Sequence, residues 1–105
     1  MKAKLLNLAW NGSPPPNDIA ASECIPFIMV RAIYHGFRNG TISRSEGELM
    51  KGYVLRYYDL SDSERSSVLQ YVIANLSEQG DTRSIVDMET LRKELEGIRG
   101  QSITA

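Results

Sequence analysis

The sequence is poor in the residues that most enzyme and metal sites require. Of its 105 residues one is a cysteine, Cys24, and one is a histidine, His35. One cysteine and one histidine cannot supply the ligands of a zinc site. The two residues are also about three turns apart on one expected helix, so they cannot form a thiolate–imidazole pair. We therefore expect a non-enzymatic protein with no catalytic residue, no metal and no cofactor.

Two further absences concern where the protein acts. A single cysteine excludes an internal disulfide, which fits a reducing compartment. The chain has no run of roughly 20 apolar residues that could cross a membrane. The short apolar run near the N-terminus is interrupted by Asn7 and is too short for a secretory signal. We expect a cytoplasmic protein with no membrane partner.

The net charge is small but unevenly distributed. It is −1 overall, yet residues 1–45 contain five Lys and Arg against two Asp and Glu, and residues 46–105 contain seven against eleven. An acidic region favours association with a basic partner surface. The candidate partner-binding carboxylates lie off the apolar stripes of the expected helices: Glu78, Asp81, Asp87 and Glu89.

A serine followed three residues later by a glutamate occurs twice, in "ISRSE" and in "LSDSE". Ser43 pairs with Glu46 in the first stretch, and Ser61 pairs with Glu64 in the second. This is the spacing of a capping box, in which the serine oxygen and the glutamate carboxylate satisfy each other's backbone N–H groups at a helix start. Each stretch therefore predicts the beginning of a helix.

The residues after each box repeat one apolar pattern, i, i+1, i+4, i+5, i+8, which marks one buried helix face. The first set is Leu49, Met50, Tyr53, Val54 and Tyr57, and the second is Val68, Leu69, Val72, Ile73 and Leu76. The pattern predicts helices over 43–58 and 61–79, joined as an antiparallel hairpin. Two more apolar patterns predict helices over 22–39 and 84–99. We expect one all-α domain, residues 1–105, of about four helices around this central hairpin.

The two ends of the chain are expected to cover the helices. Residues 1–21 contain the run Pro14–Pro16, which favours an extended strap. The last helix carries a narrow apolar seam, Met88–Ile98, whose members are three and four residues apart. That seam is expected to dock onto the hairpin or onto a second copy of the chain, which would make a homodimer.

A basic patch supports an alternative function. Arg31 and a further four cations fall where the first long helix meets the second: Arg38, Arg44, Lys51 and Arg56. Such a patch fits a small DNA-binding regulator. However, Glu46 and Glu48 occupy the helix end that a helix-turn-helix protein directs at the bases, and carboxylates there repel phosphate.

Two tyrosines fall off the apolar stripes and are expected on the surface. They are Tyr58 and Tyr71. Exposed tyrosines are enriched at protein interfaces, since a large rigid ring buries much area when a partner binds. These residues therefore favour a protein-binding function.

The stretches "AWNGSPPPND" and "FRNGTISRSEGELMKGYVLRYYDL" carry a resemblance over residues 9–60. They resemble small helical proteins of Gram-positive prophages and conjugative elements, which have a Pro-rich strap, a helix and a G-x-I turn into a Lys- and Tyr-bearing helix. The sequence departs from that pattern at Gly47 and Gly52. The resemblance implies a mobile-element protein that binds a host protein, with an anti-CRISPR inhibitor of an RNA-guided nuclease as its sharpest form. The alternatives are the DNA-binding regulator and an oligomeric structural phage protein.

Overall fold

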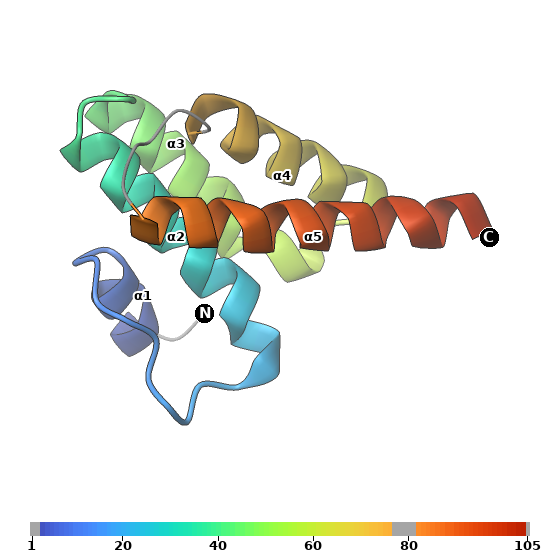
Figure 1. Cartoon of the computed structure of the whole chain (residues 1–105), viewed down its shortest axis with the longest axis horizontal. Coiled ribbons are helices and arrows are strands. Elements are labelled where there is room, and N and C mark those ends of the chain that lie inside the picture. The colour runs from blue at the N-terminus through green and yellow to red at the C-terminus, as the bar shows by residue number, and fades with distance from the viewer. Residues whose placement is uncertain (1–2, 77–81, 105) are drawn as a thin grey trace.

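The described residues fold into α-helices and the segments that link them (Figure 1). The computed structural model describes the backbone of residues 3–76 and 82–104, and the side chains of 3–76, 86–98 and 100. The helices are α1 (Ala3–Ala9), α2 (Ala21–Arg38), α3 (Arg44–Leu55), α4 (Asp62–Leu76) and α5 (Thr82–Thr104). A 3₁₀ turn over Tyr57–Asp59 links α3 to α4. The described residues contain no strand, so the expected all-α class is confirmed.

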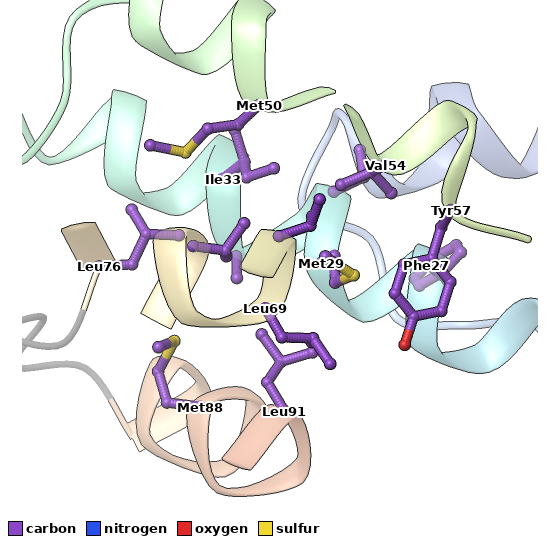
Figure 2. Packing of buried hydrophobic residues seen from close by; sticks show 14 of the residues in the cluster. Phe27, Met29, Ile33, Met50, Val54, Tyr57, Leu69, Leu76, Met88 and Leu91 are labelled. Atoms are coloured by element: carbon purple, nitrogen blue, oxygen red, sulfur yellow. The ribbon is translucent and has the colours of Figure 1, made fainter. Parts of the chain in front are cut away.

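Helix α2 lies at the centre, in contact with each of the other four α-helices. Its side chains Phe27, Met29, Val30 and Ile33 are fully buried, and Figure 2 shows three of them among residues of the surrounding helices. A helix that is apolar over such a wide arc has to be covered from several sides. The centre of the fold is therefore α2 and not the expected hairpin, because α3 packs mainly on α2, α4 packs mainly on α5, and α3 and α4 contact each other only lightly.

The N-terminal segment is not an extended strap throughout. Residues Ala3–Ala9 form α1, because Ala, Leu and Lys are all strong helix formers. The helix ends at a turn in which Gly12 has φ +75°, and a Cβ there would lie 2.8 Å from the Tyr34 ring. Residues 13–16, which include the prolines, have no regular secondary structure. The apolar side chains expected to pack on the helices do so: Leu5, Leu6, Leu8 and Trp10 lie against the core.

Both predicted capping boxes are present. The Ser43 hydroxyl oxygen accepts from the Glu46 N–H at 3.1 Å, and the Ser43 N–H donates to the Glu46 carboxylate at 3.0 Å. Ser61 and Glu64 repeat the arrangement at 3.3 and 3.2 Å. Hydrogen bonds from Ser43 lower the pKa of the Glu46 carboxyl below its ordinary value, and those from Ser61 lower the pKa of Glu64.

We expect Ser43→Ala and Ser61→Ala each to lower the free energy of unfolding by about 1 kcal/mol at neutral pH, as lost N-caps do. Because the pKa of each glutamate is lower in the folded state, its contribution is present above the unfolded pKa and is lost as the pH falls through the folded pKa. The wild type and both variants should therefore lose this contribution in acid, because alanine keeps the backbone N–H that donates to the glutamate. Urea denaturation at pH 7 and at pH 3 measures both effects.

Ser45→Ala is the matched control for the first box. Ser45 and Glu48 have the same spacing as Ser43 and Glu46, but α3 begins at Arg44 with Ser43 as its N-cap. Ser45→Ala should leave the free energy of unfolding unchanged within about 0.5 kcal/mol. Equal losses for Ser43→Ala and Ser45→Ala would show that the helix starts at the second serine instead.

Helix α5 is longer than the predicted 84–99 and packs against α4 and α2. The seam residues Met88, Leu91, Leu95 and Ile98 are at most 8% exposed. The sequence left open whether the seam packs on its own chain or on a second copy. The burial of these side chains shows that the seam packs on its own chain. Because these side chains are covered within the chain, the structure gives no support to a homodimer through Met88–Ile98, which stays a prediction.

The other helix boundaries differ from the predicted ones by a few residues. Helix α2 replaces 22–39, and Gly40 follows it with φ +81°, the left-handed conformation that ends many helices. Helix α3 ends at Leu55 rather than at 58, and the 3₁₀ turn begins at Tyr57. Helix α4 covers most of 61–79, and residues 77–79 lie outside the described residues.

Candidate functional site

An open groove of about 580 Å³ lies between α3 and α4. It exists because these helices turn their buried faces toward α2 and α5, which leaves their facing flanks apart at the surface. Its walls are made of apolar, aromatic and small polar side chains. They are Leu49, Tyr53, Arg56, Leu60, Ser63, Glu64, Ser67, Val68 and Tyr71.

Exposed apolar side chains form much of the groove. Leu49 is 52% exposed, Tyr53 38% and Tyr71 37%. The rings of Tyr53 and Tyr71 meet across the groove, edge to face, with their centroids 6.4 Å apart. Water-exposed apolar area of this kind is unfavourable unless something covers it, so the groove is a candidate binding surface.

The expected buried face of α3 is therefore only partly correct. Met50, Val54 and Tyr57 are buried, whereas Leu49 and Tyr53 lie outside the core. A stripe at i, i+1, i+4, i+5 and i+8 covers a wider arc than α2 shields. In α4 the corresponding stripe is buried, with Ile73 half-buried at its edge.

The polar residues of the groove differ in how far they are engaged. The Glu64 carboxylate is held by Ser61 in the second capping box. The Ser67 hydroxyl donates to the Ser63 carbonyl at 3.1 Å. Within the described residues, the Arg56 guanidinium has neither a hydrogen-bond acceptor nor an ion-pair partner. Arg56 is thus an uncompensated positive charge at the end of the groove where α3 leads into the turn.

The predicted acidic partner-binding set is not assembled as expected. Asp87 is 2% exposed, so its assignment to a surface was wrong. Glu89 is exposed on α5. Glu78 and Asp81 lie outside the described residues. Partner binding through Glu78, Asp81 and Glu89 stays a prediction, and Asp87 is removed from it.

Asp87 is buried because it pairs with Arg31 from α2. Arg31 Nη2 donates to Asp87 Oδ1 at 2.7 Å, and Nε donates to Oδ2 at 3.1 Å. Arg31 Nη1 also lies 3.5 Å from the Ser13 carbonyl. This two-point pairing satisfies a buried carboxylate and ties α5 and the N-terminal segment to the central helix. Because its charge is paired with Asp87, Arg31 does not contribute to the predicted basic patch.

The remaining basic residues do not form one continuous patch. Arg44 begins α3 and Arg56 follows its end, so about 18 Å of helix separates them. Lys51 forms an ion pair with Glu48 at 3.1 Å, and its Nζ lies 4.5 Å from the Trp10 ring centroid. Arg38 is exposed at the end of α2. Lys51 is therefore paired within the chain. The phosphate backbone of a bound DNA would meet Arg44 and Arg56 as separate charges.

The two predicted surface tyrosines have different surroundings. Tyr71 lines the groove. Tyr58 is 47% exposed but lies against Tyr57, and the Arg65 guanidinium covers both rings while it donates to both backbone carbonyls. Burial, followed by the nearby carboxylates, raises the pKa of both phenols above the ordinary tyrosine value. Tyr58 thus helps to fix the turn between α3 and α4, and Tyr71 is the better candidate for binding.

The surroundings of Cys24 and His35 give little indication of a chemical role. Cys24 is half-buried near the start of α2, and its thiol lies 3.6 Å from the Ala20 carbonyl. His35 Nε2 is buried without a hydrogen-bond partner among the described residues. Across the same part of the chain, no three His, Cys, Asp or Glu side chains are grouped as metal ligands would be.

No helix within the described ranges combines the length and the apolar character needed to cross a membrane.

Leu49, Tyr53 and Arg56 are the groove residues that sequence reasoning placed elsewhere. Part of the arrangement was visible in the sequence, because the three residues are spaced i, i+4 and i+7, which places them on one side of a helix.

Comparisons with protein-family models, with curated proteins and with solved structures found no match to this chain.

Proposed function

We propose that this is a non-enzymatic, cytoplasmic protein that acts by binding another protein in the groove between α3 and α4. The observation that supports this proposal is the groove itself, with Leu49, Tyr53 and Tyr71 exposed along it and Arg56 at its end. The single cysteine supports the cytoplasmic setting.

The composition of the groove favours a protein partner. Tyrosine and arginine are enriched among the residues that dominate binding energy at protein interfaces, and apolar side chains between them exclude water. A small-molecule site of similar volume encloses most of its ligand and directs several polar groups at it. Here the groove is open and Glu64 is engaged by its own helix cap, so side chains of a partner protein fit better.

The resemblance to mobile-element proteins suggests which partner to test. In that version the partner is a host defence protein such as an RNA-guided nuclease, and occupation of the groove blocks the nuclease sterically or allosterically. Binding of a basic channel by the acidic half of the chain is weakened as a mechanism, since Asp87 is internally paired. Nothing in the arrangement of Arg38, Arg44 and Arg56 favours the DNA-binding alternative.

We expect Leu49→Glu to weaken partner binding by at least about tenfold, because it introduces a charge among apolar contacts that a partner would cover. The measurement is quantitative affinity capture from lysate of the source cells, followed by titration of the captured protein. Purified RNA-guided nucleases are tested in parallel.

Val86→Glu is the matched control. Val86 is 55% exposed on α5, close to the 52% of Leu49, and it does not line the groove. Both variants place a carboxylate at a half-exposed apolar position, so both should keep the fold, which circular dichroism checks. A partner lost equally by both variants, or by neither, would contradict binding in the groove.

A further inference from the structure

We infer that the occupant of the groove is an amphipathic α-helix of about three turns, with apolar residues on one face and an acidic residue that pairs with Arg56. This inference rests on the proposed function and names the partner class. It depends on the shape of the groove walls, on the space between them and on the charge of Arg56, which has no ion-pair partner among the described residues.

The groove walls have the geometry that a third helix needs. Helix α3 has 12 residues and α4 has 15, so the walls are about 18 and 22 Å long. Leu49 and Tyr53 of α3 and Arg56 just after its end face the groove at i, i+4 and i+7, and Ser67 and Tyr71 of α4 are four apart. Side chains in such rows form ridges between which the side chains of another helix insert. A helix of about three turns spans this length.

Space at the groove also favours a helix. Helix axes pack 8–10 Å apart only where side chains at the contact are small enough. Ser63 and Ser67 are small residues on the α4 wall of the groove. A partner's backbone can therefore approach most closely at these serines.

The two other common peptide conformations fit less well. An extended strand binds by adding to a sheet edge, and here both walls are helices, whose backbone groups already bond internally. A polyproline helix inserts prolines between aromatic rings. The Tyr53 and Tyr71 rings instead meet each other at 90°, so they leave no open slot between them.

The charge at the groove specifies the partner's polar residue. Arg56 lacks an ionic partner within the described residues, whereas Glu64 is held by its cap and Lys51 is paired with Glu48. A carboxylate on the occupant complements Arg56. The acidic residue is therefore expected at the end near the turn, and the apolar residues toward Leu49 and Tyr71.

The test is a selection from a displayed library of random 14-residue peptides on the wild-type protein, with counter-selection on the Leu49→Glu variant. We expect peptides with apolar residues at i, i+3 or i+4, and i+7, and an acidic residue at one fixed position. The same peptides should become helical on binding, measured by circular dichroism. Groove-dependent peptides that are proline-rich, extended or basic would overturn the helix inference and leave the proposed function standing. Failure to obtain any groove-dependent peptide would overturn the proposed function as well.

Arg56→Glu tests the charge separately. It should weaken the selected acidic peptides roughly 2- to 5-fold, the range of exposed ion pairs, and replacing the acidic residue by Lys in the peptide should restore the affinity. Arg38→Glu, outside the groove, should leave unchanged the affinity for the acidic peptides and for their Lys-substituted versions. Equal effects of the two variants would overturn the pairing with Arg56. Sedimentation velocity of the wild type tests whether a second copy of the chain occupies the groove. A dimer that Leu49→Glu abolishes would overturn the inference that the occupant is a helix of another protein.

Discussion

Asp87→Ala should lower the free energy of unfolding by about 3–5 kcal/mol, the usual effect of breaking a buried ion pair from one side. Asp87 is 2% exposed and is the two-point partner of Arg31, so the substitution leaves a largely buried guanidinium without its carboxylate. A domain of this size has only about 5–15 kcal/mol of stability. Urea denaturation followed by circular dichroism measures the loss.

Glu89→Ala is the control for that prediction. Glu89 lies two residues further along α5 and is exposed, so its removal should change the free energy of unfolding by no more than about 0.5 kcal/mol. The double variant Arg31→Met with Asp87→Leu should recover much of the lost stability, because no unpaired charge is then buried. If Asp87→Ala were as mild as Glu89→Ala, the pair would not be part of the folded core.

Phe27→Ala is expected to have a comparable effect, about 3–5 kcal/mol, through the cavity that it leaves. The Phe27 ring is fully buried in the central helix, and Figure 2 shows it in the same buried cluster as Tyr57 of the turn that joins α3 to α4. The Arg31 guanidinium also lies 5.9 Å from the ring centroid. Loss of the ring therefore removes contacts to several parts of the fold at once.

Ile28→Ala provides the comparison for Phe27→Ala at the adjacent position. Ile28 is only partly buried, so its truncation should be clearly less destabilising. Chemical denaturation of both variants under the same conditions measures the difference. Equal losses at the two positions would mean that α2 is rotated relative to the orientation described above.

The features that the sequence predicted best are local ones. Each capping box needs only Ser43 with Glu46, or Ser61 with Glu64, three residues apart, so chain neighbours determine it. The apolar stripe of α4 follows from helical periodicity in the same way. Helix α1 was missed because the nearby prolines dominated the interpretation of residues 1–21, although the prolines follow the helix rather than lie in it.

The features that could not be predicted depend on residues far apart in the chain. Asp87 looked like a surface carboxylate because its partner, Arg31, is 56 residues away in sequence. Leu49 and Tyr53 looked buried because periodicity does not show how much of the α3 face α2 covers. The groove joins those two residues to Tyr71, which the sequence had placed on the surface. No local pattern indicates that the three side chains meet, so the groove could not be predicted from the sequence.

Site-specific photo-crosslinking in the source cells tests most directly whether the groove binds a partner. A photoreactive phenylalanine analogue replaces Leu49 in the groove in one variant, and Val86 on α5 in the other. Both positions are about half exposed, so they differ in location rather than in access. The groove account predicts a discrete crosslinked protein from position 49 and none from position 86. A crosslink from position 86 with none from position 49 would contradict it.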